Sequence, residues 1–499
     1  MWWLIFLISP CLALVDREPV LNMRRTRTTP VEGFVQVRLN HFMASDTRTF
    51  PMRYYYNSEF AGENLVILVG GEWAISPEWL QGGLAHEMAE QMNAGLFYTE
   101  HRFYGNTRPF SDSSLENLSF LSIDQALADL AQFIQHVKSD LFEDGRYKNA
   151  TVALVGCSYA GTMATWMRLA YPHLVDAAFS DSGPLHAQEN FPEYLEVVAE
   201  AIKEQGGSTC LTSLEESVQA LVDLLATPAG PTLVSEMFGT CTVIQATTPL
   251  DVATFFMFGI ISSLAVLVQY ATPGDITGAC AVLTAANVSD PVQRLANYVT
   301  SEPLWAPCLE TRYTQVVANS RNTSFDAPES QMRLWLYQTC AEFGWYQTTT
   351  SSKQPFLSTV PLEYFHQICR DFYSSYFDEA RLRSGIKRTN IFFGGLTHLP
   401  DRVVSVAGGH DPWSPMGPNS THAHQKAPVY VVPGVSHCRA MQSTGSSDTA
   451  ELETVKKAVL DHMYEFAIGP IDRPISSATD VGANMALLFT AAMALVRNW

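Results

Sequence analysis

The stretch Thr151-Val-Ala-Leu-Val-Gly-Cys-Ser-Tyr-Ala-Gly-Thr-Met-Ala-Thr-Trp-Met-Arg-Leu169 decides the fold of this chain. A short apolar, β-branched run leads to Ser158, and a helical pattern of apolar residues follows at once. The stretch predicts a strand, a sharp turn and a helix with a serine at the apex, as in a nucleophile elbow. Small residues belong around such a serine, because its backbone is strained and the helix packs close behind it. Ala160 stands where glycine is usual, with Gly161 next, and an ordinary glycine-serine turn is the alternative.

Around this stretch, buried strands alternate with helices. We expect strands near 64–69, 94–99, 151–155 and 175–180, and helices near 82–92 and 123–137. Apolar-polar alternation over 33–56 predicts antiparallel strands before them. Strand-and-loop segments resume at 402–411 and 427–437, and an amphipathic helix at 449–466 closes the domain. The alternation predicts a mostly parallel sheet with helices on both faces.

Near Phe191 the alternation stops, and helical patterns with four cysteines follow. We interpret this part as a helical, disulfide-containing cap domain inserted into an α/β domain. The uncharged run 252–270 is expected to be a buried cap helix rather than a membrane span, because it holds glycine, serine and glutamine. The expected domains are a signal peptide at 1–15, an α/β-hydrolase domain at 30–189 and 331–468, the cap at 190–330, and a tail at 469–499.

Three strand-end loops carry Ser158, Asp411 and His437, in that order. Loops at the carboxyl ends of parallel strands meet at one edge of the sheet, so we expect these side chains to lie together. A serine hydroxyl needs an imidazole to take its proton and a buried carboxylate to fix the imidazole tautomer. Each residue alone would also fit a turn or loop. Together, in the order found in α/β-hydrolases, they predict a catalytic triad.

The tetrahedral intermediate of such a reaction needs hydrogen-bond donors for its oxyanion. The first expected donor is the backbone N–H of Tyr159. The second is expected from the loop Gly70-Gly-Glu-Trp73, through the N–H of Glu72 or Trp73, with an ordinary tight turn as the alternative. Trp413 and Trp73 are candidates for lining the substrate pocket. No metal and no cofactor is required by this chemistry.

Three ionisable residues near strand ends, Glu72, Glu100 and Arg102, have two interpretations. They could bind a substrate terminus, or they could pair with one another and brace their loops. We favour bracing, because it is the commoner role of such groups.

The net charge of the chain argues against one class of function, and its leader and sequons indicate export through the secretory pathway. The net charge of -19, with no run rich in lysine or arginine, argues against nucleic-acid binding. The apolar leader over 2–15 is typical of a secretory signal, although it lacks a basic start. Five sequons agree with export to a lysosomal, endosomal or extracellular site: Asn117, Asn149, Asn287, Asn322 and Asn419.

Nine cysteines are present, and loss of Cys11 with the leader leaves eight. Six are expected to form structural disulfides of undetermined pairing: Cys210, Cys241, Cys280, Cys308, Cys340 and Cys369. Cys157 and Cys438 each adjoin a proposed catalytic residue, and we interpret them as two small buried thiols rather than a redox pair.

The chain ends in a run of apolar residues over 485–496 that is too short to span a bilayer. Small residues at 476–478 and a polar spacer precede it, which is the layout of a glycolipid-anchor signal. The terminal Arg497-Asn-Trp499 is atypical of such a signal, and a disordered or amphipathic tail is the alternative.

Motifs over 34–440 resemble the lysosomal Pro-X carboxypeptidase family of serine peptidases, which also holds dipeptidyl peptidase II and thymus-specific serine protease. The matching stretches are 34–42, Gly70-Gly-Glu72, Glu100-His-Arg-Phe-Tyr-Gly105, 121–130, Gly156-Cys-Ser-Tyr159, Gln338-Thr-Cys-Ala-Glu-Phe-Gly344, Asp411-Pro-Trp413 and Ser436-His-Cys438. The resemblance implies an α/β-hydrolase fold, the triad named above, and cleavage after proline from one end of a peptide.

The chain departs from that family at the elbow, where Cys157 and Ala160 replace glycines, and in the oxyanion loop, where Trp73 replaces a glycine. A bulky Trp73 is expected to narrow the pocket beside the oxyanion donors. We predict a proline-specific serine exopeptidase, acting as a carboxypeptidase or a dipeptidyl peptidase. The alternatives are an esterase or lipase on the same fold and a catalytically silent binding protein. Whether the chain forms a homodimer is left open.

Overall fold

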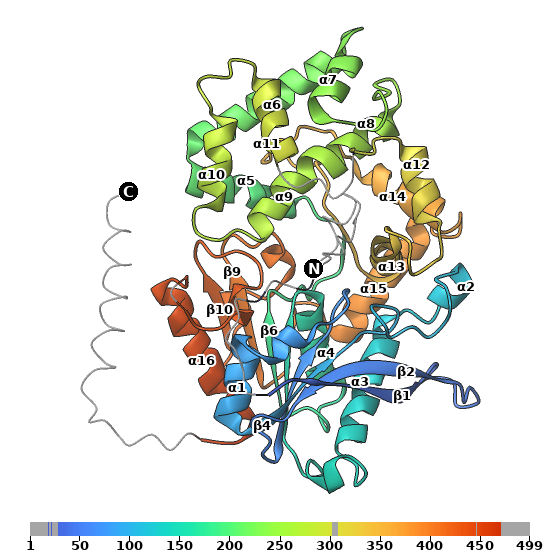
Figure 1. Cartoon of the computed structure of the whole chain (residues 1–499), viewed down its shortest axis with the longest axis vertical. Helices are drawn as coiled ribbons and strands as arrows, with labels where there is room; N and C mark the ends of the chain where they lie inside the picture. Colours follow the sequence, from blue (N-terminus) through green and yellow to red (C-terminus); the bar gives the residue numbers. More distant parts are fainter. Residues whose placement is uncertain (1–17, 19–20, 22–27, 302–307, 446, 471–499) are drawn as a thin grey trace, which may run out of the picture.

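The computed structural model describes residues 18, 21, 28–301, 308–445 and 447–470. The expected signal peptide and almost all of the expected tail, with its anchor signal, lie outside the described residues. Within them, an eight-stranded sheet forms the base of the molecule (Figure 1). Its strands are β1 (Val31–Arg38), β2 (Thr49–Asn57), β3 (Asn64–Val69), β4 (Ala94–Thr99), β5 (Val152–Cys157), β6 (Ala177–Asp181), β9 (Val403–Gly408) and β10 (Val429–Val432).

The strand order is β1-β2-β4-β3-β5-β6-β9-β10. β2 pairs antiparallel with both β1 and β4, and every other pairing is parallel. The central strands are buried on both faces, as their unbroken apolar sequences predict. The predicted mostly parallel sheet with an antiparallel start is confirmed.

Helices cover both faces of this sheet. α1 (Gly83–Met92) packs with α16 (Ala450–Ala467) on one face, and α3 (Ile123–Val137) packs with α4 (Tyr159–Ala170) on the other (Figure 1). The α3 helix begins after Ser122, whose side chain accepts a hydrogen bond from the Gln125 N–H, and its apolar stripe lies against the sheet. All four helices fall where the sequence predicts them. The short helix α2 (Leu115–Leu118) precedes α3.

Between β6 and β9 the chain leaves the sheet and forms a helical layer over its carboxyl edge (Figure 1). The helices are α5 (Glu193–Gly206), α6 (Ser208–Leu225), α7 (Gly230–Phe238), α8 (Pro249–Phe255), α9 (Ser262–Gln269), α10 (Asp275–Leu283), α11 (Pro291–Ser301), α12 (Tyr313–Ser320), α13 (Ser330–Gln338), α14 (Leu362–Phe372) and α15 (Glu379–Phe393). A two-stranded sheet of β7 (Gln188–Asn190) and β8 (Gly344–Tyr346) joins this layer. Helices therefore continue well beyond residue 330, where we drew the end of the cap.

The longest apolar helix of this layer runs over Pro249–Gln269, with a π-helical turn at Phe256–Ile261 between α8 and α9. By length and composition alone it could cross a membrane, but 78% of its most apolar window is buried against other helices. This burial agrees with the expected cap helix.

The six mid-chain cysteines form three disulfides: Cys210–Cys280, Cys241–Cys308 and Cys340–Cys369. The first two lie among the helices α5 to α12, and the third joins the π-helical turn Thr339–Phe343 to α14. The expectation of structural disulfides is confirmed for these residues.

Candidate active site

Ser158 stands between the end of β5 and the start of α4, with φ 54° and ψ −132°. This strained conformation is the one that a nucleophile elbow imposes. Close packing around the turn explains the neighbouring glycine, because a Cβ on Gly156 would lie 2.2 Å from the Ala160 carbonyl oxygen. Ala160 itself is fully buried and fits. The elbow geometry therefore tolerates alanine at this position.

Asp411 and His437 follow β9 and β10 at the same edge of the sheet. His437 Nδ1 lies 2.8 Å from Asp411 Oδ1, and both side chains are almost completely buried. Asp411 also accepts a hydrogen bond from the Trp413 N–H at 2.9 Å, which holds its carboxylate in place. A buried carboxylate at this distance fixes the imidazole tautomer with its proton on Nδ1.

A fourth disulfide, Cys157–Cys438, brings the elbow and the histidine loop together, with 5.7 Å between the two Cα atoms. Cys157 directly precedes Ser158, and Cys438 directly follows His437. Our interpretation of two buried thiols is therefore wrong. The signal was present in the sequence: if Ser158 and His437 meet, cysteines next to each of them must also lie close together.

The three predicted motif stretches 100–105, 156–159 and 338–344 converge on the side chain of Tyr159. Its hydroxyl accepts a hydrogen bond from Gln338 Nε2 at 2.9 Å and lies 3.2 Å from His101 Nε2. Burial lowers the pKa of His101 to about 4, so the ring is neutral. Its Nδ1 donates to the Arg102 carbonyl oxygen, and its Nε2 accepts a hydrogen bond from the Tyr159 hydroxyl. Tyr104 completes the chain by donating to Gln338 Oε1 at 2.7 Å. These contacts fix the first residue of α4, which carries the expected oxyanion donor.

The loop that is expected to supply the second donor lies beside the same network. Glu72 is buried, and its charge contributes to the raised pKa values of Tyr104 and Tyr159, whose main cause is burial. The Glu72 carbonyl oxygen accepts a hydrogen bond from Gln331 Nε2 at 2.5 Å, which ties the loop to α13.

Trp73 is buried in this loop. Its indole packs against Gly71, which offers no side chain, and its Nε1 donates to the Tyr98 hydroxyl at 2.7 Å. Trp73 lines neither of the two cavities described below. Its expected place beside the oxyanion donors stays a prediction.

Glu100 and Arg102 brace loops, as we favoured, but they pair with other residues than we expected. Glu100 forms a buried ion pair with Arg53 and accepts hydrogen bonds from Asn106 N–H and Thr107 Oγ1. Arg102 forms a buried two-bonded ion pair with Asp129, at 2.6 and 2.7 Å. Neither Glu100 nor Arg102 is therefore left to bind a substrate terminus.

A small aromatic cavity has Trp413 in its wall, although none of Ser158, Asp411 and His437 lines it. Its other walls include Trp335, which packs against Tyr159 at 5.6 Å between ring centroids, and Trp345, which packs against Trp413 at 5.7 Å. The lining is otherwise almost wholly apolar, from Met257, Phe258, Met332, Leu336, Tyr346, Tyr364, Phe365 and Ile368. Its volume is about 40 Å³. A single water needs about 10–15 Å³ of such space, so a group of a few heavy atoms fits.

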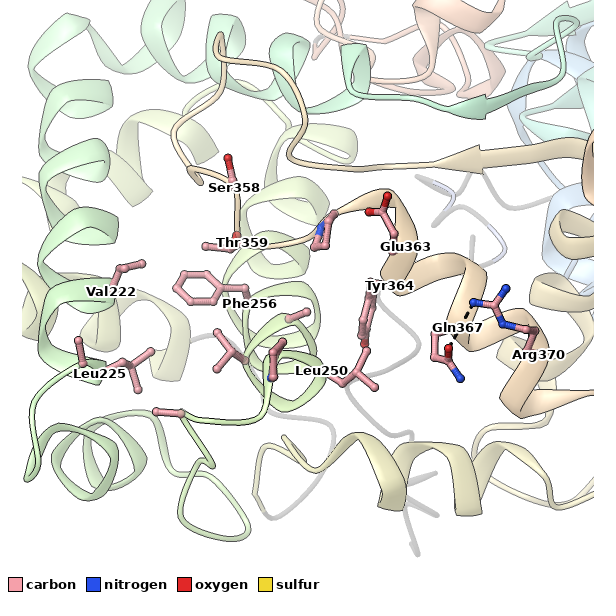
Figure 2. A pocket seen from close by; sticks show the side chains of 16 residues that line it. Val222, Leu225, Leu250, Phe256, Ser358, Thr359, Glu363, Tyr364, Gln367 and Arg370 are labelled. Carbon is pink, nitrogen blue, oxygen red and sulfur yellow. Dashed lines mark hydrogen bonds between the residues drawn. The ribbon is translucent and has the colours of Figure 1, made fainter. Parts of the chain in front are cut away.

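A second and larger cavity, of about 640 Å³, lies among α6, α8 and α14 in the helical layer (Figure 2). Leu225, Leu250 and Phe256 form its apolar side, and Glu363 and Arg370 lie at its α14 end. No triad residue lines this cavity. Tyr364 lines both cavities, so its ring lies between them.

The helical layer touches the triad through Gln269, the last residue of α9. Its backbone oxygen accepts the His437 N–H at 3.0 Å. Its side-chain oxygen accepts from Trp413 Nε1 at 3.2 Å and from the Tyr194 hydroxyl at 2.6 Å. Nothing in the sequence pattern indicated this role, because Gln269 ends an apolar run far from the motif residues.

A second carboxyl group, Asp181, lies at the end of β6 next to the histidine loop. Its backbone oxygen accepts the Ser158 N–H at 2.9 Å, and its side chain accepts the Met441 N–H at 3.0 Å. Burial raises its pKa to about 7, and the nearby His437 acts in the opposite direction. Sequence analysis missed this residue as well.

Four of the five sequon asparagines are exposed: Asn149, Asn287, Asn322 and Asn419. Asn117 is half-buried, and its Nδ2 donates to Asp112 at 3.0 Å. Glycosylation of these residues stays a prediction.

A mixed sheet with this strand order, a serine at a strained strand-to-helix turn, and a helical layer over the carboxyl edge define an α/β-hydrolase. The family model described as serine carboxypeptidase S28 matches residues 37–459. The chain belongs to this family and is a serine-type peptidase.

Two curated relatives agree with this assignment. Thymus-specific serine protease of Mus musculus is 30% identical over 455 residues, covering 88% of this chain and 87% of the relative. Lysosomal Pro-X carboxypeptidase of Bos taurus is 31% identical over 248 residues, covering 47% of this chain and 49% of the relative. Among solved structures, proline iminopeptidase of Mycobacterium smegmatis is 10% identical, with a TM-score of 0.35 over 87% of this chain and 99% of that one. The disulfides and the lysosomal relative are consistent with a protein of the secretory pathway.

Proposed function

We propose that this peptidase cleaves peptides on the carboxyl side of proline, from one end of the chain, through an acyl-enzyme on Ser158. Asp411 and His437 complete the triad. The observation that carries the proposal is the aromatic cavity lined by Trp335, whose ring packs against Tyr159, and by Trp413, whose backbone N–H donates to Asp411. An apolar cavity with room for a few heavy atoms suits a pyrrolidine ring and disfavours charged or large side chains.

In the proposed reaction, Ser158 Oγ attacks the carbonyl carbon of proline while His437 Nε2 takes the hydroxyl proton. The Tyr159 N–H and an N–H from Glu72 or Trp73 donate to the developing oxyanion. His437 then gives its proton to the leaving amine, and the carbon–nitrogen bond breaks. A water molecule, activated by the same imidazole, hydrolyses the ester and frees Ser158.

Restriction to chain ends is supported by burial of the triad. Ser158, Asp411 and His437 are each at most 3% exposed. The helical layer lies directly above them, with Gln269 bonded to the His437 backbone. A free terminus needs less room at such a buried site than an extended polypeptide does. The bovine relative's name, Pro-X carboxypeptidase, agrees with this specificity.

The compartment is part of the same proposal. Four disulfides require an oxidising route through the secretory pathway, and we propose a lysosomal, endosomal or extracellular destination. A glycolipid anchor and a homodimer stay predictions.

One experiment tests the reaction and its direction. A proline-containing peptide, free at both ends, is incubated with the purified protein at pH 5 and pH 7, and mass spectrometry identifies the products. Loss of one residue after a penultimate proline indicates a carboxypeptidase, and loss of an Xaa-Pro dipeptide indicates a dipeptidyl peptidase. Ser158→Ala serves as the inactive control.

Matched peptides with alanine or phenylalanine in place of proline test the cavity argument. We expect a clear preference for proline, and equal cleavage of all three peptides would refute proline specificity. A panel of short-chain esters and lipids, tested in parallel, separates a peptidase from an esterase or lipase on the same fold.

A further inference from the structure

The Cys157–Cys438 disulfide joins the two loops that carry the proposed nucleophile and its base. The two cysteines are 281 positions apart in the chain. Both side chains are buried, at 3% and 2% exposure, so this disulfide belongs to the interior of the site and not to its surface. Among the described residues, the other three disulfides lie in the helical layer and do not adjoin a triad residue.

β10 ends at Val432, so His437 lies in the loop beyond this strand and is not held by strand pairing. His437 is held through backbone hydrogen bonds to other elements: its N–H to Gln269, and the Cys438 N–H to Ser182 Oγ at 3.0 Å. Cys438 has φ 56° and ψ 24°, a left-handed conformation that a residue with a side chain rarely adopts. Such a conformation persists only where the surroundings hold it, and the disulfide supplies a covalent restraint at that residue.

The nucleophile side is restrained in parallel. Ser158 donates its N–H to Asp181, and the Asp181 side chain accepts from Met441 in the histidine loop. The end of β6 therefore bridges the two loops by hydrogen bonds, and the disulfide bridges them covalently. Hydrogen bonds of this kind can lengthen by some tenths of an ångström at little cost, whereas a disulfide cannot.

We propose that Cys157 and Cys438 are positioning residues, and that their disulfide sets the distance between His437 and Ser158 and makes turnover depend on redox state. The proposal rests on the triad of the proposed function. Small displacements of catalytic groups reduce the rate strongly, because proton transfer needs a near-attack arrangement. Substrate binding uses the separate aromatic cavity, so loss of the restraint should affect kcat and leave KM nearly unchanged.

Reduction of the disulfide is a balanced exchange with a dithiol reagent. One thiolate of the reagent attacks a sulfur atom, the Cys157–Cys438 bond breaks, and the second thiolate releases the mixed disulfide. The protein gains two electrons and two protons as two thiols, and the reagent becomes a cyclic disulfide. The ligand atoms of Cys157, His437 and Cys438 lie within 4.8 Å of one another, so the reduced form also offers sulfur and nitrogen ligands to a soft metal ion.

The test compares Cys157→Ser/Cys438→Ser with Cys241→Ala/Cys308→Ala, which removes a disulfide of the helical layer. We expect kcat of the first double variant to fall about 10-fold or more with KM within about 2-fold, while the second variant keeps the wild-type kcat. An unchanged kcat in the first variant overturns the proposal. An equal loss of kcat in both variants also overturns it, since that result indicates general destabilisation.

A second measurement applies if the first variant does not fold. The purified wild-type protein is treated with dithiol reagent and a metal chelator, and mass spectrometry of alkylated peptides shows which disulfides open. Activity that falls with opening of Cys157–Cys438 and returns on reoxidation supports the proposal, and full activity in the opened protein overturns it. The rate at which a fluorophosphonate labels Ser158 is followed throughout. Labelling needs no peptide, so a wild-type protein that is labelled but cleaves no proline peptide contradicts the proposed function alone.

Discussion

His437 Nδ1 and Asp411 Oδ1 lie 2.8 Å apart with both side chains shielded from water. The carboxylate fixes the imidazole so that Nε2 is free of its proton, which is the form that a general base requires. We therefore expect Asp411→Asn to lower kcat by about 10⁴-fold and to leave KM and folding nearly unchanged. Steady-state kinetics with a proline peptide measures the loss, and circular dichroism checks the fold. A loss of less than about 10-fold would mean that Asp411 is not the partner of the base.

The positions of Ser158, Asp411 and His437 could be predicted because each follows a strand of a parallel sheet, whose carboxyl ends share one edge. The sheet and its four covering helices followed in the same way from hydrophobic periodicity. Gln269 could not be predicted, since its contact with Trp413 joins residues 144 positions apart on different layers. Packing between layers depends on shape, and local patterns carry little information about shape.

Cys157 shows how an error of interpretation arose. The disulfide was missed because each cysteine was weighed as a single buried thiol, although the predicted meeting of Ser158 and His437 already placed the pair together. The contacts of Trp73 could not be predicted from its position in the loop. Its indole reaches the Tyr98 hydroxyl, because a buried indole N–H needs an acceptor and Gly71 leaves space for the ring.

The side chain of Gln269 provides a second prediction, because it accepts a hydrogen bond from Trp413 while its backbone oxygen accepts one from His437. Gln269→Leu keeps the backbone contact and removes the acceptor of Trp413 and Tyr194. We expect KM for proline peptides to rise about 10-fold with kcat within about 3-fold, and stability to fall by roughly 1–3 kcal/mol. Kinetics and thermal unfolding measure the two effects. Tyr194→Phe, which removes one donor and keeps Gln269, is the control, and an unchanged KM in Gln269→Leu would contradict the role of Trp413.

The ring of Tyr364 provides a third prediction, because it lies between the aromatic cavity and the larger cap cavity. Tyr364→Ala should connect the 40 Å³ and 640 Å³ spaces and admit larger side chains than proline. We expect the ratio of kcat/KM for phenylalanine over proline peptides to rise about 10-fold. Tyr364→Phe keeps the ring and removes the hydroxyl, which contacts Thr254 at 2.9 Å, so it should keep the wild-type ratio. Equal ratios in both variants would show that the Tyr364 ring does not determine whether proline or phenylalanine is accepted in the cavity.

Two fully buried carboxyl groups provide the last prediction, which concerns pH. Burial raises the pKa of Asp181 to about 7 and that of Glu342 to about 8, from ordinary values of 3.8 and 4.5. Between the unfolded and folded pKa values the native state binds more protons than the unfolded state, so stability falls as pH rises through this window. The stabilising contribution is fully present below about pH 4 and is lost by about pH 8. We expect Tm to fall by roughly 5 °C between pH 5 and pH 8.

Substitution assigns this dependence to the two groups. Asp181→Asn and Glu342→Gln keep an acceptor for the N–H groups of Met441 and Ile123 and remove the charge. Thermal unfolding across pH 4–9 should therefore show a flatter profile in each variant, with the gain in Tm confined to the alkaline side. Lys456 and His437 favour the ionised form of Asp181, but burial outweighs them, the Asp411 charge acts in the same direction as burial, and the pKa of Asp181 is raised. A profile as steep as that of the wild-type protein would mean that both carboxyl groups ionise freely in the native state.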